Sequence, residues 1–547
     1  MIDAGLVWVG PSPASIRAMG LKDAAKKLMM AAGVPVTPGY IPGLGAKDQS
    51  PECLQKEADS IGYPVLIKAV AGGGGKGMRK VDERENFLAA LDSCKREANS
   101  SFANSGVLLE KWITSPRHIE VQVFGDTHGN LVHLFERDCS LQRRHQKVIE
   151  EAPAPGMDEA TRQAICGAAV RAAKAVAYVG AGTIEFIADA SEGLRADRVF
   201  FMEMNTRLQV EHPVTEEITG VDLVEWQLRV ASGEELPLKQ EDIAISGHAI
   251  EARLYAEDPA KGFLPSTGRL ERFHLSTYRA RIETGYEQGD AVSPFYDPML
   301  AKIVVHAEDR AEAVEAMDTE CATAVVWPVK TNSVFLARVF ESAEFRAGGI
   351  DTGFLERRQN ELMAMAGVDD KTVQIGASEV LRRVQFPGLP RKEARTKRLP
   401  RDLLGFRLNS APRLAFPIAV DGVIALVEPD VAGHTAWTID YLGDTGVLVS
   451  NDEGQLFHFD VPRTENAPGA SAADGAILAP MPGKVIAVDV AEGDAVEAGQ
   501  RLLVLEAMKM EHALTAPFAG TVAELAAREG QQVQVEALLA RVEKAAD

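Results

Sequence analysis

The chain has 547 residues, a net charge of −21 and a pI of about 5.1. This length predicts about three to five domains at roughly 100–200 residues each, and the acidic excess argues against general affinity for nucleic acid or an anionic membrane. Five dispersed cysteines without a CxxC pair argue against a disulfide framework and favour a reducing, cytoplasmic compartment. No apolar run approaches the roughly 18 residues that a membrane helix needs.

The N-terminus predicts a strand followed by a helix. The apolar run Leu6–Val9 predicts a strand that begins almost at the first residue, and 14–34 predicts a helix closed by Gly33. A sheet strand so near the start suggests that the sequence begins inside a domain. We therefore expect this strand to have few neighbours on one side and to expose apolar surface.

Residues 51–250 alternate short β-branched runs with helical stretches, which predicts an α/β fold. Strands are expected at Val65–Lys68, Val107–Glu110, His118–Phe124, Asn130–Glu136, Thr183–Ala188 and Val199–Met204, and a helix at Asp158–Tyr178. Short strands with turn signals predict a small β domain at 403–462, and an Ala/Pro/Gly-rich stretch follows as a linker.

Four consecutive glycines follow the first of these strands. Gly72–Gly75 and Lys76 come after Val65–Lys68. The backbone N–H groups of such a loop approach phosphate oxygens closely, and Lys68 would add a charge. A flexible surface loop is the alternative, but the apolar strand and the basic flanks favour phosphate binding. No GK[ST] follows, so this is no Walker A loop, and the run resembles the glycine lid of the ATP-grasp fold.

Polar residues alternate with apolar ones after Phe201. The polar members all occupy odd positions: Glu203, Asn205, Arg207, Gln209 and Glu211. An extended segment would place them on one face. A solvent-facing strand gives the same pattern, but this set lacks lysine and follows a predicted strand that carries Glu185. Glu185 and Glu203 on adjacent strands would offer carboxylate oxygens to Mg²⁺, and Asn205 would join them.

The C-terminal segment 474–547 contains an internal repeat. Ala479-Pro480-x-x-Gly483-x-Val485 and Glu492-Gly493-x-x-Val496 both recur 37 residues later, at Ala516 and at Glu529. Two similar β units that pack as pseudo-twofold halves explain the repeat, because neither half buries its core alone. The junction Glu506–Glu511 is expected to be an exposed turn.

Lys509 stands at the symmetry point of the repeat, between Met508 and Met510. Most lysines are ordinary surface residues, but two methionines on an exposed turn are hard to explain as core. A lysine on a protruding turn suits attachment of a prosthetic group, because its long stem extends the group's reach. Ala507–Met510 resembles the signature of biotinyl domains; lipoyl domains share the fold but typically place an aspartate beside the lysine.

The order of motifs over residues 1–350 resembles the biotin carboxylase component of the acyl-CoA carboxylases. Besides the glycine run, the resemblance rests on 110–113, 117–120, 136–147, 203–215 and 248–253. With the biotinyl tail, the chain is similar to α subunits that act in 3-methylcrotonyl-CoA, geranyl-CoA, propionyl-CoA or acetyl-CoA carboxylation. Residues 201–208 and 222–227 favour the 3-methylcrotonyl branch.

The resemblance implies an α/β architecture with six segments. They are a remnant of an N-terminal lobe (1–20), an ATP-grasp domain (21–233), a biotin carboxylase C-terminal domain (234–360), a mainly β partner-docking domain (375–462), a linker (463–473) and a flattened β-barrel carrier (474–547). Family members normally open with a Rossmann-like lobe, so the resemblance implies that roughly 100 residues of this lobe are absent from the sequence.

The resemblance also implies roles for single residues. The implied ATP contacts are Lys22, Lys68, Gly73, Gly74, Gly75, Glu110, Lys111, Ile113, His118, Gln142 and His145. Glu185, Glu203 and Asn205 would hold Mg²⁺ or Mn²⁺. The implied bicarbonate contacts are Arg207, Gln209, Val210 and Lys147. Glu211 would be the general base that deprotonates bicarbonate, and Arg253 would stabilise the enolate oxygen of biotin.

The implied reaction is ATP-dependent carboxylation by bicarbonate of biotin attached to Lys509. The chain is too short for a carboxyltransferase domain, so the resemblance implies a separate carboxyltransferase β subunit in a hetero-oligomer, and biotin protein ligase as a further partner. The rival expectation is a catalytically impaired biotin carrier and scaffold that lacks one lobe. Bicarbonate-dependent ATPase activity with free biotin separates the two.

Overall fold

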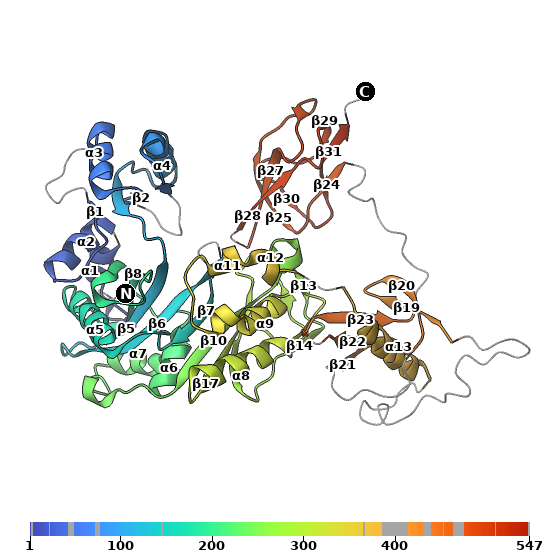
Figure 1. The fold of residues 1–547 in the computed structure, drawn as a ribbon, viewed down its shortest axis with the longest axis horizontal. Helices are drawn as coiled ribbons and strands as arrows, with labels where there is room; N and C mark the ends of the chain where they lie inside the picture. Colours follow the sequence, from blue (N-terminus) through green and yellow to red (C-terminus); the bar gives the residue numbers. More distant parts are fainter. Residues whose placement is uncertain are drawn as a thin grey trace, which may run out of the picture.

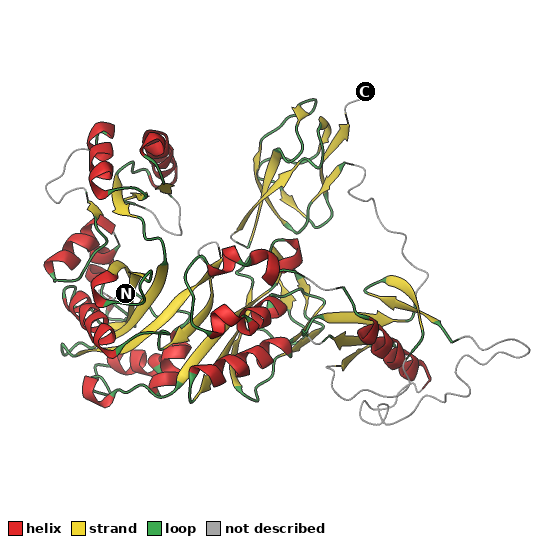
Figure 2. Ribbon diagram, in the orientation of Figure 1, coloured by secondary structure: helices red, strands yellow, loops and turns green. Residues whose placement is uncertain are grey.

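The computed structural model describes residues 1, 4–20, 22–41, 49–71, 77–143, 146–364, 367–385, 414–429, 439–451, 453–462, 475–508 and 510–544. Figure 1 shows a large body, a small lobe beside it, a β unit that carries a single long helix, and a C-terminal β unit. In Figure 2 the C-terminal unit contains strands and loops only. None of the described helices is long and apolar enough to cross a membrane.

The N-terminal segment differs from its predicted form. Leu6–Val9 is coil and pairs with no strand among the described residues, so the predicted strand is wrong. Its side chains are exposed, as expected, with Val7 at 72%. The predicted helix over 14–34 is two helices, α1 (Pro13–Met19) and α2 (Lys22–Ala31), because the first ends at Gly20.

The large body is built on an eight-stranded antiparallel sheet of order β15-β17-β10-β7-β6-β5-β8-β9. Its strands are β5 (Pro116–Gly125), β6 (Leu131–Arg143), β7 (Gln146–Ala152), β8 (Gly180–Asp189), β9 (Val199–Asn205), β10 (His248–Tyr255), β15 (Ala280–Thr284) and β17 (Met299–Ala307). The strands expected at 118–124, 130–136, 183–188 and 199–204 are confirmed within it. The expected helix 158–178 is α5 (Glu159–Lys174).

Alternation along β5 determines which face of this sheet is polar. Ile119, Val121 and Val123 pack in one core cluster with α5 residues such as Ile165. The even-numbered residues therefore point to the opposite face. They are His118, Glu120 and Gln122, which are all polar and all buried. A buried polar face of this kind needs partners, and the functional site lies on it.

The small lobe is a four-stranded sheet of order β1-β4-β2-β3 with two helices. Its elements are β1 (Gly39–Tyr40), α3 (Pro51–Ile61), β2 (Val65–Ala69), β3 (Met78–Val81), α4 (Phe87–Phe102) and β4 (Val107–Lys111). Strands β2 and β4 confirm the predictions at 65–68 and 107–110. The glycine run, including the predicted ATP contacts Gly73, Gly74 and Gly75, lies outside the described residues.

The β unit after residue 370 begins with a helix that the sequence reading missed. Helix α13 (Asp370–Gln385) packs on a five-stranded sheet of order β20-β19-β23-β22-β21. The strands are β19 (Phe416–Val420), β20 (Val423–Val427), β21 (Ile439–Leu442), β22 (Gly446–Ser450) and β23 (Leu456–Asp460). Gly376 permits the close packing, because a Cβ there would lie 2.4 Å from the Phe459 ring. Residues 403–413 and the expected linker lie outside the described residues.

The C-terminal unit has two four-stranded sheets, of order β24-β31-β29-β26 and β28-β27-β25-β30. Its strands are β24 (Ala476–Leu478), β25 (Gly483–Val488), β26 (Ala495–Val496), β27 (Arg501–Ala507), β28 (Met510–Thr515), β29 (Gly520–Leu525), β30 (Gln532–Val533) and β31 (Leu538–Lys544). The 37-residue offset relates β25 to β29, β26 to β30 and β27 to β31. When the strands are matched in this way, the two sheets have the same strand order, which confirms the predicted pseudo-twofold unit.

The turn between β27 and β28 was expected to be exposed, and among its described residues this holds for Glu506 and Glu511 but not for Met508. Met508 is only 3% exposed and has a left-handed φ of 49°. Its N–H donates to the carbonyl oxygen of Pro294 (3.1 Å), and its side chain joins a core cluster that includes Leu254 and Leu300 of the large body. Met508 is buried because it contacts the large body; Lys509 lies outside the described residues.

Candidate active site

A cavity of about 490 Å³ brings together most of the residues that the sequence predicted. Those predicted residues are Lys68, Glu110, His118, Gln142, Lys147, Glu185, Glu203, Asn205, Arg207, Gln209, Val210, Glu211 and Arg253. A cavity of about 190 Å³ shares several of these residues and adds Lys111 and Ile113. His145 and the side chain of Lys22 lie outside the described residues.

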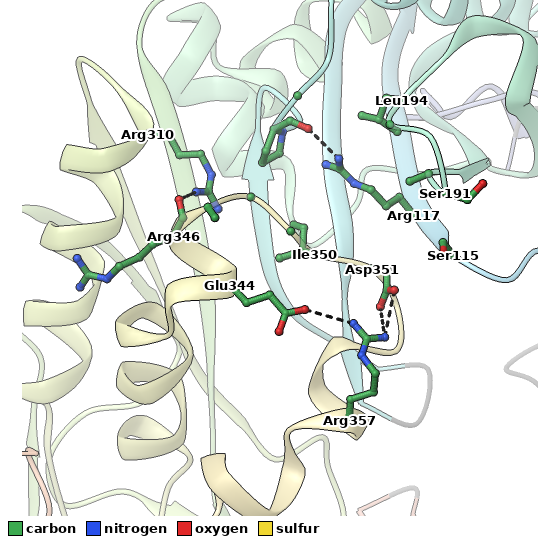
Figure 3. Close-up of a pocket in the computed structure, with 17 residues that line it drawn as sticks. Ser115, Arg117, Ser191, Leu194, Arg310, Glu344, Arg346, Ile350, Asp351 and Arg357 are labelled. Atoms are coloured by element: carbon green, nitrogen blue, oxygen red, sulfur yellow. Dashed lines mark hydrogen bonds and ion pairs between the residues drawn. The ribbon is translucent and has the colours of Figure 1, made fainter.

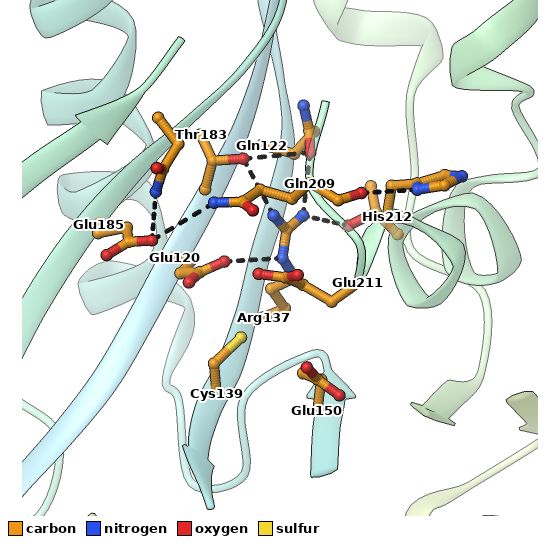
Figure 4. A network of polar contacts seen from close by, with 12 residues as sticks. Glu120, Gln122, Arg137, Cys139, Glu150, Thr183, Glu185, Gln209, Glu211 and His212 are labelled. Carbon is orange, nitrogen blue, oxygen red and sulfur yellow. Dashed lines mark hydrogen bonds and ion pairs between the residues drawn. The ribbon is translucent and has the colours of Figure 1, made fainter. Parts of the chain in front are cut away.

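A buried network centred on Arg137 of β6 (Figure 4) adjoins the cavity, because Glu120 of this network contacts the cavity-lining residue Lys147. The Arg137 guanidinium donates to Glu120 Oε2 (3.1 Å), Gln122 Oε1 (3.0 Å) and Thr183 Oγ1 (3.0 Å). Burial alone would lower the pKa of Arg137, but the Glu120 charge raises it. Burial would raise the pKa of Glu120, but Lys147 and Arg137 hold it well below its usual value. The network is therefore ionised and fixes the strands that carry the site.

Two carboxylates meet on adjacent strands, as the sequence predicted. β8 and β9 pair so that Glu185 is directly opposite Glu203. The Asn205 side-chain amide donates to Glu185, and His118 Nε2 lies 3.2 Å from Glu185 Oε2. Glu185 and Glu120 raise the pKa of His118 to about 10, against the opposing effect of burial. Two carboxylates and an amide oxygen are the hard donors that Mg²⁺ prefers, so the donor set fits this ion.

Glu211 lies between two cations at the base of the cavity and is 1% exposed. Lys147 Nζ lies 2.5 Å from its Oε1, and Arg253 Nη2 lies 2.9 Å from its Oε2. Each cation has a second carboxylate, since Lys147 also contacts Glu120 and Arg253 also contacts Glu150. Glu211 is thus a carboxylate at the cavity wall whose two oxygens have fixed orientations.

The extended segment expected through residue 211 is shorter than predicted. β9 ends at Asn205, a loop follows, and α6 (His212–Thr219) begins directly after Glu211 with Pro213 in its first turn. The odd-numbered polar side chains still line the cavity, but so do the even-numbered Met202 and Val210. The loop turns the chain, so strict alternation does not continue after the strand.

Two lysines converge on Glu110 at the small-lobe side of the cavity. Lys68 Nζ lies 2.6 Å from Glu110 Oε2, and Lys26 contacts the other oxygen. These cations lower the pKa of Glu110 to about 2, although burial raises it. Lys26 was not predicted. It lies one helical turn after Lys22 on α2, and the i, i+4 spacing was the available signal.

Sequence reasoning also missed Glu120, Arg137, Glu150 and Tyr255. Glu120 and Arg137 lay inside motifs that were quoted for the resemblance, but no role was given to them. The signal for Glu120 was the alternation along β5, where polar residues share the face opposite the aliphatic ones. Arg137 and Glu150 carry no local signal of this kind, because their partners come from distant parts of the chain.

A larger cavity of about 650 Å³ lies elsewhere on the large body (Figure 3). Four arginines line it, but each one contacts a carboxylate of this chain. Arg117 is 2.6 Å from Asp138, Arg310 is 2.7 Å from Glu151, and Arg346 is 3.2 Å from Asp318. Arg357 lies 2.8 Å from Asp351. None of the site residues predicted from the sequence lines this cavity, so the smaller cavity is the better candidate for the active site.

Three protein-family models match the chain. They are the ATP-binding domain of the carbamoyl-phosphate synthase L chain over residues 22–239, the biotin carboxylase C-terminal domain over 251–357, and the biotin-requiring enzyme domain over 475–542. The first two cover the elements that form the cavity. The third covers the repeated C-terminal unit, in agreement with the expected biotinyl carrier.

Named relatives match nearly the whole chain. The mitochondrial methylcrotonoyl-CoA carboxylase subunit alpha of Dictyostelium discoideum is 43% identical over 95% of this chain and 79% of its own. The propionyl-CoA carboxylase alpha chain of Ruegeria pomeroyi is 38% identical over 98% of this chain and 86% of its own.

The fold also matches a solved structure. It is the biotin carboxylase domain of Hydrogenobacter thermophilus 2-oxoglutarate carboxylase, in complex with MgADP, ADP and bicarbonate. The TM-score is 0.62 at 42% identity, over 67% of this chain and 79% of that one. The chain therefore belongs to the biotin-dependent carboxylases, as a biotin carboxylase component joined to a biotinyl domain.

Proposed function

We propose that this chain uses ATP and bicarbonate to carboxylate biotin carried on Lys509, as the first half-reaction of a 3-methylcrotonyl-CoA carboxylase. The observation that carries the proposal is the position of Glu211, a buried carboxylate held between Lys147 and Arg253 beside the Glu185–Glu203 pair. A base, fixed cations and a pair of carboxylates are the parts that phosphoryl transfer to bicarbonate requires.

Each group has a defined task in this proposal. Arg207, whose guanidinium donates to Gln209 Oε1 (2.6 Å), offers a planar fork that matches the bicarbonate anion, with Lys147 and Val210 beside it. Glu211 accepts the bicarbonate proton. Arg253 then supplies a fixed positive charge where the acceptor's enolate oxygen develops.

The nucleotide would lie across the two adjoining cavities. Lys22 and Lys68 would contact phosphates, and Lys111 and Ile113 would border the base. Glu185, Glu203 and Asn205 would hold Mg²⁺, which supplies charge neutralisation at the transferred phosphate.

Replacing Glu203 tests the metal assignment. Glu203→Gln is nearly isosteric at a partly solvent-exposed strand end, so the fold should survive. The loss of one anionic oxygen should weaken Mg²⁺-dependent ATP binding by roughly tenfold or more, about 1.4 kcal/mol. Titration calorimetry with and without Mg²⁺ measures the change. Glu192→Gln, an exposed carboxylate after β8, is the matched control. Equal Mg²⁺-dependent affinity for ATP in the two variants would show that Glu203 does not hold the metal.

The contact between Met508 and the large body supports delivery of the carrier's own biotin. Met508 binds at Pro294, three residues before Asp297, which lines the catalytic cavity together with Tyr255. This contact brings the described part of the β27–β28 turn to a segment of the large body that borders the catalytic cavity. We propose that this contact is the position in which the chain carboxylates itself.

Met508→Asp tests this docking. A charge in an apolar cluster is disfavoured, so transfer of label from bicarbonate to the carrier should fall by about tenfold or more. Carboxylation of free biotin by the same variant should stay at the level of the unmodified chain, because the cavity is intact. Biotin content, measured by intact mass, normalises the rates. Equal self-labelling at equal biotin content would refute the docking role.

The acyl-CoA half-reaction is expected to need a second subunit. We propose a carboxyltransferase β subunit that docks on residues 375–462, and a biotin protein ligase that modifies Lys509. The purified biotinylated chain should give no product with 3-methylcrotonyl-CoA, propionyl-CoA, acetyl-CoA or geranyl-CoA, and the β subunit should restore product with the first of these. Product formed by the chain alone would contradict this division. If the β subunit restores product only with propionyl-CoA, the chain is better explained as the α subunit of a propionyl-CoA carboxylase.

The compartment is also a proposal. The dispersed cysteines favour a reducing compartment, and we propose the cytoplasm. The Dictyostelium relative is named as mitochondrial. Cell fractionation with an antibody against the chain decides between the two.

A further inference from the structure

A buried carboxyl lies beneath the catalytic arginine and has no role in the mechanism above. Glu251 precedes Arg253 by two residues on β10, and none of its surface is exposed. Neither of its carboxyl oxygens has a hydrogen-bond partner among the described residues. Buried polar groups without partners are rare in folded proteins, so this carboxyl needs an explanation.

The explanation begins with the register of the sheet. β10 pairs with β7 so that Glu251 is directly opposite Glu150. Directly opposite residues in antiparallel strands point to the same face with their Cβ atoms roughly 5 Å apart. Arg253 Nε donates to Glu150 Oε1 (2.7 Å), whereas Glu150 Oε2 has no partner among the described residues. Three unpartnered oxygens therefore belong to two facing carboxyls.

Among the described residues, no cation forms a hydrogen bond with Glu251 that would balance a second charge at this position. Lys302 of β17 lies 3.9 Å from Glu251 Oε2, which is too long for a hydrogen bond. Its Nζ instead donates to the carbonyl oxygen of Val210 (2.6 Å) and lies 2.8 Å from Glu283 Oε2. Arg253 is committed to Glu150 and Glu211. Two ionised carboxylates facing each other here are strongly unfavourable.

We propose that Glu251 and Glu150 share one proton, and that Glu251 is a positioning residue for Arg253. The protonated Glu251 donates to the free Oε2 of Glu150, which leaves Oε1 of Glu150 to hold the guanidinium. The pair then carries a single negative charge. The positioning role rests on the proposed function, whereas the shared proton does not.

The net electrostatic effect of the facing groups agrees with this assignment. Burial and the charge of Glu150 raise the pKa of Glu251 well above its ordinary value, while Lys302 and Arg253 lower it less and Glu211 raises it further. Burial also raises the pKa of Glu150, although Arg253 opposes the shift. Ionisation at alkaline pH would place a second negative charge beside Arg253 and Glu211, and turnover should fall there.

The shared proton is tested without any activity measurement. In the unfolded chain Glu251 ionises near its ordinary pKa of 4.5, whereas the folded protein keeps the proton. Folding therefore takes up a proton above pH 4.5, and the stability of the unmodified chain falls as pH rises towards the folded pKa. Glu251→Gln removes this dependence, so its melting temperature relative to the unmodified chain should rise with pH above 4.5. The unmodified chain should show a protonated-carboxyl band in its infrared spectrum at neutral pH, and this band should be absent from Glu251→Gln.

Glu320→Gln is the matched control. Glu320 is also buried with one unpartnered oxygen, but it lies on α8 (Arg310–Ala322) away from the cavity. Its substitution should leave the infrared band in place. A band unchanged by Glu251→Gln, or a melting-temperature difference that does not vary with pH, would overturn the shared proton.

The positioning role is tested by the pH profile of ATP-dependent carboxylation of free biotin by the full chain, because Arg253 acts in that step. Glu251→Gln keeps a hydrogen-bond donor that cannot ionise, so the alkaline limb should move up by about one pH unit or more. Glu251→Met lacks the donor and should lower kcat at every pH. If Glu251→Gln loses the infrared band but its alkaline limb stays at the same pH, the positioning role is wrong and the shared proton stands. A folded chain without turnover would count against the proposed function, and the infrared and melting data would still decide the shared proton.

Discussion

Lys509→Arg should abolish biotin attachment while leaving the fold intact. Biotin is joined through an amide to a lysine amine, and a guanidinium is a permanently charged, poor nucleophile that cannot replace it. Chain expressed with a biotin protein ligase should show no avidin signal and no added mass. Because biotin is the acceptor, carboxyl transfer to the chain should be lost completely, the largest effect expected of any substitution here.

A matched control comes from the same β unit. Lys484 is an exposed lysine on β25, and Lys484→Arg should keep full biotin content. Both variants should melt at the temperature of the unmodified chain. An avidin signal that persists in Lys509→Arg would place the modification on another residue.

Glu211→Gln should lower bicarbonate-dependent ATP hydrolysis by roughly 10²–10⁴-fold, the usual contribution of a general base. The amide cannot accept the bicarbonate proton, although it fills the same space. The fold should tolerate the change, because Lys147 retains Glu120 and Arg253 retains Glu150. Steady-state phosphate release with free biotin measures the rate, and ATP affinity should change little.

Glu217→Gln is the control for this substitution. Glu217 lies on α6, the helix that begins after Glu211. Among the described residues its one ion-pair partner is Arg281, which keeps two other carboxylates. Its rate should equal that of the unmodified chain. A Glu211→Gln enzyme within threefold of the control would show that another group removes the proton.

Features that arise from local repetition were predictable from the sequence. The 37-residue offset predicted a pseudo-twofold unit, and the two sheets of the carrier have the same strand order. The spacing of Glu185 and Glu203 predicted their approach, and the β8–β9 register places them directly opposite each other. Both results follow from strand geometry, which the sequence pattern reflects directly.

Features that depend on distant partners were not predictable. Leu6–Val9 has the composition of a strand, but a strand also requires a neighbour, and none of the described strands pairs with it. Met508 is buried because the large body covers it, which no pattern within 474–547 reveals. The partners of Arg137 and Glu150 likewise come from segments far along the chain.

The most direct test of the central claim is transfer of radiolabelled bicarbonate to the purified, biotinylated 547-residue chain, without β subunit or acyl-CoA. We expect ATP- and Mg²⁺-dependent label on the chain, about one equivalent per biotin, with none on Lys509→Arg and little on Glu211→Gln. A folded, fully biotinylated chain that takes up no label would contradict the account and leave it as a biotin carrier and scaffold.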